Sequence, residues 1–230
     1  MSLWSDFWKL FFPQSCLICG KTLLEGEEHL CFRCLVGLPR THMHLQPENE
    51  VEKCLWGKMP VERGSAFLHY AKGGDVRKLL SELKYQGNAK LGLFMGRCMA
   101  RELLASGFFE GIDGIMPVPL HRRKQRMRGY NQSRMLAEGI SAVTGIPLWD
   151  SLLVRTQFTE TQTRKGSYER WLNVRDVFEC PSPEVMAGKH VLLVDDVMTT
   201  GATLVACGDA LREVKGLRIS VLTLAMAGHS

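Results

Sequence analysis

The chain has 230 residues, 45% of them hydrophobic, which allows a substantial core in one main domain and leaves room for a small additional one. It contains no run of about 18 apolar residues, so we expect no membrane-spanning helix, and its first residues lack the basic segment and cleavage site of a signal peptide, so we expect a cytoplasmic protein. The net charge of +5 is too small for a histone-like polycation.

The chain opens with aromatic residues at helical spacing. These are Trp4, Phe7, Trp8, Phe11 and Phe12, and Pro13 follows them. A helix over this segment would gather the five rings on one face, which we expect to dock on the body of the protein. The alternative, a helix lying on a membrane surface, would need an opposite face rich in Lys and Arg, and the segment has none.

Four of the eight cysteines fall within nineteen residues as two C-x-x-C pairs. They are Cys16, Cys19, Cys31 and Cys34. Two such pairs can supply four thiolates to one tetrahedral zinc ion, because each tight turn presents two sulfurs. A redox-active pair is the alternative, but two pairs so close together favour a structural zinc site. The remaining cysteines are scattered among apolar neighbours and are expected to be inert.

From residue 64 onward, short apolar strands alternate with helices. Strands are expected at 66–71, 112–118, 191–194 and 217–225, and helices at 75–83, 89–105, 131–140 and 203–214. Such alternation predicts an α/β fold with a mainly parallel sheet and helices on both faces. Residues 35–63 are mixed and polar, and are expected to form a connector. We therefore expect a small N-terminal part at 1–63 and a main domain at 64–230.

The basic charge is concentrated after the second expected strand. Residues 112–135 carry six basic residues against one acidic residue, a surplus as large as that of the whole chain. Five of these basic residues lie within seven positions: Arg122, Arg123, Lys124, Arg126 and Arg128. This density favours an anionic ligand or a phosphate backbone at one place, and the alternative is a solvated basic loop.

The segment VLLVDDVMTTGAT at 191–203 gives the strongest indication of a site. Ligands of open α/β sheets bind at the carboxyl ends of the strands, where Asp195 and Asp196 are expected. Adjacent carboxylates suit the two hydroxyls of a ribose. The turn that follows, Thr199, Thr200, Gly201, Ala202 and Thr203, can surround a 5′-phosphate with N–H groups and hydroxyls at a helix start. The alternative is an ordinary helix-start turn in which Asp only caps the helix.

This segment resembles the signature of type I phosphoribosyltransferases, which bind 5-phosphoribosyl diphosphate (PRPP). With the sequence RGYNQ at 128–132 and the two cysteine pairs, nearly the whole chain resembles the ComF family of competence proteins, in which a four-cysteine zinc ribbon precedes a phosphoribosyltransferase-like domain. The resemblance implies that Asp195 and Asp196 hold the ribose as the catalytic pair, that Mg²⁺ accompanies PRPP, and that the basic run faces the diphosphate. It also implies that residues 156–165 belong to a loop that closes over the ligand.

By this resemblance we expect a PRPP-binding or nucleotide-binding protein linked to the uptake or processing of transforming DNA, with DNA-processing proteins as partners. No segment identifies a nucleobase acceptor, so the sequence leaves catalysis open. The alternatives are a non-catalytic nucleotide sensor, a module that binds single-stranded DNA, and a nucleobase salvage phosphoribosyltransferase. Only one aromatic residue, Tyr130, lies in the sequence beside the basic run, which weakens the case for DNA binding by base stacking.

Overall fold

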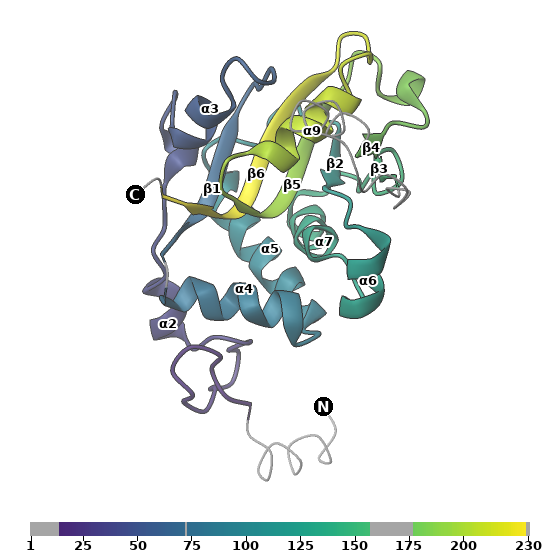
Figure 1. The fold of residues 1–230 in the computed structure, drawn as a ribbon. Coiled ribbons are helices and arrows are strands. Elements are labelled where there is room, and N and C mark those ends of the chain that lie inside the picture. Colours follow the sequence, from purple (N-terminus) through teal and green to yellow (C-terminus); the bar gives the residue numbers. More distant parts are fainter. Residues whose placement is uncertain (1–13, 72, 157–176, 229–230) are drawn as a thin grey trace.

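The computed structural model describes residues 14–71, 73–156 and 177–228. Its centre is a parallel sheet of four strands in the order β1-β6-β5-β2 (Figure 1). The strands are β1 (Gly64–Tyr70), β2 (Gly114–Pro117), β5 (His190–Met198) and β6 (Arg218–Ala227). All three pairings are parallel, as the alternation of strands and helices predicts. The expected α/β fold with a parallel sheet is therefore confirmed.

Helices cover both faces of the sheet (Figure 1). One face packs against α4 (Asp75–Tyr85), α5 (Ala89–Leu104) and α7 (Gln132–Thr144). The other packs against α3 (Glu50–Leu55) and α9 (Ala202–Ala210). The smaller elements are α2 (Phe32–Val36), η1 (Met43–Leu45), α6 (Arg122–Arg128), η2 (Pro183–Met186) and the antiparallel pair β3 (Val154–Arg155) and β4 (Phe178–Glu179).

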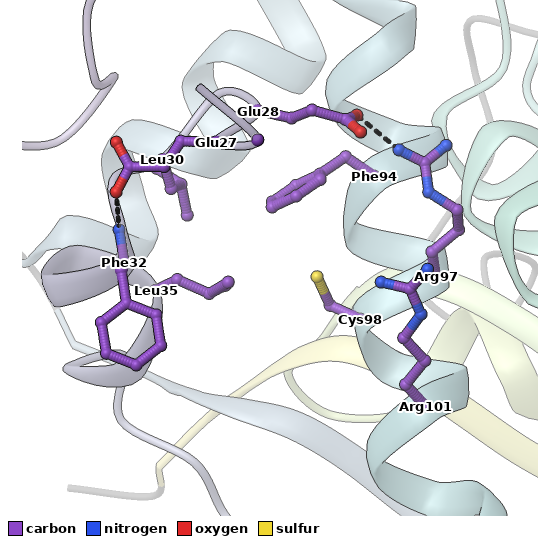
Figure 2. A pocket seen from close by; sticks show the side chains of 10 residues that line it. Glu27, Glu28, Leu30, Phe32, Leu35, Phe94, Arg97, Cys98 and Arg101 are labelled. Carbon is purple, nitrogen blue, oxygen red and sulfur yellow. Dashed lines mark hydrogen bonds and ion pairs between the residues drawn. The ribbon is translucent and has the colours of Figure 1, made fainter. Parts of the chain in front are cut away.

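The four-cysteine segment packs against α4 and α5. Glu28 forms an ion pair with Arg97 of α5 at 2.6 Å (Figure 2), and Lys78 of α4 donates a hydrogen bond to the carbonyl of Ile18 at 3.1 Å. Leu30 is only 1% exposed and belongs to the same hydrophobic cluster as the inner residues of α5. A pocket of about 210 Å³ remains between this segment and α5 (Figure 2). The N-terminal part is thus continuous with the core of the main domain.

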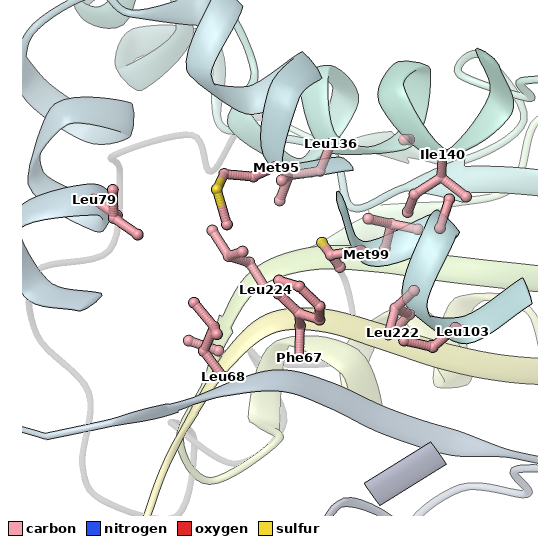
Figure 3. Close-up of a cluster of buried hydrophobic side chains, with 14 of the residues drawn as sticks. Phe67, Leu68, Leu79, Met95, Met99, Leu103, Leu136, Ile140, Leu222 and Leu224 are labelled. Carbon is pink, nitrogen blue, oxygen red and sulfur yellow. The ribbon is translucent and has the colours of Figure 1, made fainter. Parts of the chain in front are cut away.

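The core lies in two layers because successive side chains of a strand point to opposite faces. In β5, Leu192 and Val194 join the layer under α4, α5 and α7, whereas Val191 and Leu193 join the layer under α3 and α9. All four residues are fully buried. Figure 3 shows the first layer, in which methionines and leucines of α5 meet residues of β1 and β6. A strand buried on both faces reads as a continuous apolar run, which is how β5 appears in the sequence.

A glycine contact sets the position of α7 against α5. A Cβ atom at Gly96 would lie 2.1 Å from the carbonyl oxygen of Leu136, and one at Gly139 would lie 2.3 Å from that of Leu93. Only glycine permits such a close approach of two backbones. This packing fixes α7 with its first turn beside the carboxyl end of β5, where Ser133 contacts the acid pair.

Several boundaries differ from those expected. Part of the predicted connector forms α3, because Asn49 caps a helix whose residues Val51 and Leu55 are fully buried. The strand expected at 191–194 runs on to Met198, since its pairing with β6 continues beyond the two acids. Residue Gly74, not Asp75, caps α4. The aromatic N-terminal segment and nearly all of the expected closing loop lie outside the described residues. Among the helices that the structure describes, none has the length and apolar character to cross a membrane.

Candidate functional site

The acid pair lies near the carboxyl end of β5 and is held from two sides. On one side, the hydroxyl of Ser133, in the first turn of α7, donates a hydrogen bond to Asp195 Oδ1 at 2.9 Å. On the other, Lys84 in the last turn of α4 places its Nζ 3.1 Å from Asp196 Oδ1. The backbone N–H of Asp196 also donates to Asp195 Oδ1 at 2.8 Å. These three contacts orient both carboxylates.

The two carboxylates influence each other electrostatically. Removal of the Asp195 carboxyl from water and the neighbouring charge of Asp196 raise its pKa to about 7, although the N–H of Asp196, the Ser133 hydroxyl and Lys84 act in the opposite direction. Perturbed carboxyl groups of this kind cluster at functional sites, because a structure built only for stability rarely keeps two acids in contact.

The turn that follows β5 is shaped by a buried glycine at the start of α9. Gly201 is buried and adopts a φ of 74°, a left-handed conformation that favours glycine. Its neighbours Thr199, Thr200, Ala202 and Thr203 are exposed. Helix α9 begins directly after this glycine, so the N–H groups of its first turn lie at the turn. A phosphate bound here would meet N–H groups and Thr hydroxyls at a helix N-terminus.

The five clustered basic residues lie in a short helix, α6. Its N-cap is His121, which accepts a hydrogen bond from the N–H of Arg123 at 3.2 Å. Four of the five are exposed and form no ion pair with any residue that the structure describes; they are Arg122, Arg123, Lys124 and Arg126. Their charge is therefore available to an anionic partner.

Arg128 is the basic residue that connects α6 to the acid pair. Its Nη1 donates to Gln132 Oε1 at 2.9 Å, and the next residue of α7 is Ser133, which binds Asp195. Its guanidinium also lies 5.6 Å from the centre of the Tyr85 ring. Arg128 is thus the member of the basic run that contacts α7, the helix that supplies Ser133 to the acid pair.

Three residues at this site had not been identified from the sequence: Lys84, Tyr85 and Ser133. The last turn of α4 supplies two of them, about 110 positions before the acid pair in the chain. The tyrosine expected beside the basic run, Tyr130, is half-buried and donates its hydroxyl to the carbonyl of Leu83 at 2.6 Å. Tyr85, which is 72% exposed, is the aromatic ring available beside Arg128. In the sequence, the segment KYQG at 84–87 points to this site only through the family resemblance.

The four clustered cysteines are brought together as predicted. Their sulfur atoms all lie within 4.8 Å of one another, and those of Cys19 and Cys31 are 3.7 Å apart. Zinc–sulfur bonds of about 2.3 Å in a tetrahedron require sulfurs about 3.8 Å apart, so the spacing fits a metal ion. Gly20 has a φ of 73° and donates its N–H to the carbonyl of Cys16, which forms the tight turn of the first pair.

The pKa values of two of these thiols are shifted in opposite directions. Burial raises the pKa of Cys16, but N–H donors of Cys19, Cys31 and Ile18 outweigh it and lower the value to about 6. Desolvation and the neighbouring sulfurs raise the pKa of Cys34 to about 12. Four sulfurs this close can all be thiolates only around a positive ion, which is what a metal site requires.

Comparison with known proteins identifies relatives along most of the chain. A family model described as phosphoribosyl transferase domain matches residues 133–230. The DNA utilization protein YhgH of Escherichia coli (strain K12) is 32% identical over 193 residues, covering 82% of this chain and 80% of that protein. Competence protein F of Haemophilus influenzae is 35% identical over 216 residues, covering 92% of this chain and 84% of that protein.

Among solved structures, the glutamine PRPP amidotransferase from B. subtilis aligns with 61% of this chain and 30% of its own. Its TM-score is 0.42 and its sequence identity 21%.

Proposed function

The chain belongs to the ComF/YhgH family of phosphoribosyltransferase-domain proteins, and from this premise we propose that it binds PRPP, or the 5′-phosphate of a nucleotide, at the carboxyl end of β5. The observation that carries the proposal is the ordered acid pair followed at once by the turn at Gly201. A diol and a phosphate joined by a single ribose are the ligand groups that these two features can bind together.

Each part of the site has a defined role in this proposal. Asp195 and Asp196 accept hydrogen bonds from the ribose hydroxyls. The turn at 199–203 holds the 5′-phosphate. Arg128, the member of the basic run that contacts α7 through Gln132, meets the diphosphate, because a guanidinium can contact phosphate oxygens in pairs. Mg²⁺ bound to PRPP supplies further neutralisation of the diphosphate charge.

If the protein is an enzyme, a nucleophile attacks C1′ of the ribose while the bond from C1′ to the diphosphate breaks. The diphosphate leaves with the electron pair of that bond. The acid pair would hold the sugar in place during this step, and the basic residues would stabilise the charge that develops on the leaving group. If it is a sensor, the same groups hold the ligand and no bond breaks.

One assay separates these two possibilities. The zinc-loaded protein is mixed with PRPP, Mg²⁺ and a panel of purine and pyrimidine bases, and release of diphosphate is followed. A base-dependent release of diphosphate supports a transferase and identifies its acceptor. Tight binding of PRPP without release supports a sensor, and absence of PRPP and nucleotide binding would reject the proposed function altogether.

The N-terminal segment is proposed to hold one structural zinc ion through Cys16, Cys19, Cys31 and Cys34. The sulfur spacing and the family support this assignment. None of the eight cysteines of the chain, all of which lie in the described residues, forms a disulfide. We also propose a cytoplasmic protein linked to the uptake or processing of DNA; its relatives are named a DNA utilization protein and a competence protein.

A second candidate function is binding of single-stranded DNA by α6. The observation that favours it is the exposed ring of Tyr85 beside Arg128, together with four exposed cations of α6 that form no ion pair within the described part of the chain. A cationic track with an aromatic ring that bases can stack on is the usual arrangement for single strands. Both functions can coexist, because the acid pair and the exposed face of α6 use different residues.

A further inference from the structure

Lys84 forms an ion pair at the proposed ribose site. Its Nζ lies 3.1 Å from Asp196 Oδ1, and the two side chains are 21% and 13% exposed. Removing a lysine and an aspartate from water costs free energy that offsets most of their attraction, so a pair of this kind contributes little net stability. Its presence at the acid pair therefore needs an explanation other than stability alone.

The docking of α4 does not depend on this ion pair. The helix buries four apolar residues, Val76, Leu79, Leu80 and Leu83, in the core. Its last turn is also tied down by the hydrogen bond from the hydroxyl of Tyr130 to the carbonyl of Leu83. Lys84 is thus placed by a helix that is already anchored, and its ammonium group is directed to the acid pair.

The electrostatic surroundings of the pair show what Lys84 provides. The groups that face the two carboxylates are the Ser133 hydroxyl from α7, the Cys207 thiol from α9 and Lys84 from α4. Arg155 of β3 acts on the Cys207 thiol. Lys84 is the cation that contacts the pair within the described residues. A ligand with a diphosphate adds several negative charges beside two carboxylates, which favours protonation of the acids and weakens their hold on a diol.

We propose that Lys84 is a positioning residue of the ribose-phosphate site, which orients Asp196 toward the sugar hydroxyls and offsets the negative charge of the acid pair when an anionic ligand is bound. The inference rests on the proposed function and deepens it. It makes the last turn of α4 part of the site: Lys84 serves the acid pair, and the next residue, Tyr85, lies against Arg128 on the basic helix.

The test compares Lys84→Met and Lys84→Arg with wild-type protein in calorimetric titrations with Mg²⁺-PRPP between pH 5.5 and 8.5. Lys84→Met should weaken binding at pH 7 by about tenfold or more, and the pH at which binding is lost on acidification should move upward. Lys84→Arg keeps the charge and should restore the wild-type pH profile. The matched control is Lys78→Met, on the same helix, which removes a surface ion pair with Asp75 and a hydrogen bond to the carbonyl of Ile18, and should change neither property.

Two outcomes would overturn the inference while leaving the proposed function intact. One is wild-type affinity and pH profile in Lys84→Met. The other is an equal loss of affinity at every pH, which would mean that Lys84 only supports the structure. If wild-type protein binds no PRPP, the proposed function fails, and the role of Lys84 is then measured without ligand. In that case ¹³C NMR titration of the Asp195 carboxyl in Lys84→Met should show it protonating at higher pH than in wild type, because the charge of Lys84 lowers its pKa. Unchanged titration would reject the inference.

Discussion

Gly201 lies directly against Leu55 of α3. A Cβ atom at Gly201 would be 3.0 Å from Leu55 Cδ2 and 3.2 Å from Met198 Cε. The turn proposed to hold the 5′-phosphate therefore rests on a helix that belongs to the N-terminal part of the chain. Leu55 is fully buried, so its side chain is held in place by the core. The turn at Gly201 therefore cannot shift toward α3.

Gly201→Ala should therefore disturb both the turn and ligand binding. The left-handed conformation costs alanine roughly 1 kcal/mol, and the close contact with Leu55 adds to that cost. We expect a loss of about 1 to 3 kcal/mol in the free energy of unfolding and weaker PRPP binding. Gly145→Ala is the matched control, since Gly145 has a φ of 73° but nothing within 4 Å of an added Cβ. Equal effects of both changes on binding would contradict this account of the turn.

Asp195 should make the stability of the ligand-free protein depend on pH. Its pKa is about 7 in the folded protein and near 3.8 when unperturbed, so the folded state holds the extra proton between these values. The free energy of unfolding should consequently fall as pH rises toward 7. In urea unfolding, the free energy of unfolding of Asp195→Asn relative to that of wild type should rise by about 2 kcal/mol between pH 5.5 and pH 8. For the control Asp75→Asn, at an exposed position, this relative free energy of unfolding should not change with pH. An equal rise in both variants would argue against a raised pKa at Asp195.

The cysteine cluster should hold one zinc ion per chain. Cys19→Ser should abolish the metal, whereas Cys98→Ser, outside the cluster, should retain it. Because Leu30 packs in the same core as α5, loss of zinc should lower the melting temperature of the whole protein by about 5 °C or more, and should not act on the N-terminal segment alone. Elemental analysis and thermal unfolding measure both quantities. Purified wild type with well below one zinc per chain would contradict the assignment.

The exposed cations of α6 should determine the salt dependence of any binding to single-stranded DNA. The slope of log affinity against log salt is about −0.7 for each neutralised phosphate. Replacing Arg122, Arg123 and Lys124 by Ala should flatten it by roughly two units, because three contacts are lost. The control removes three exposed lysines elsewhere: Lys53, Lys58 and Lys215. If both triple variants keep the wild-type slope in a titration of a labelled oligonucleotide, α6 does not bind DNA.

The sequence predicted the parts of the molecule whose residues are close together in the chain. The strand at 191–194, its two acids and the glycine turn form one continuous segment, and the four cysteines lie within nineteen residues. In each case spacing alone determines which side chains can meet. The alternation of apolar strands and helices is also a pattern along the chain, and it predicted the parallel sheet.

The remaining parts of the site depend on contacts between distant segments. Nothing near Lys84 in the sequence shows that the last turn of α4 meets β5, or that Tyr85 lies beside Arg128. The polar stretch at 35–63 conceals α3, since only a few of its apolar residues, such as Leu55, are needed to dock one short helix. Such contacts follow from the packing of α4 and α3 on the sheet, which a local pattern cannot specify.

The central claim is tested most directly by calorimetric titration of Mg²⁺-PRPP into wild-type protein and into the double variant Asp195→Asn, Asp196→Asn. A control variant, Asp209→Asn, removes an acid of α9 that pairs with Arg212 away from the acid pair. We predict that wild type and Asp209→Asn bind PRPP with the same affinity, while the double variant binds none and still unfolds cooperatively. Unchanged affinity in the folded double variant would contradict the assignment of the ribose site to Asp195 and Asp196.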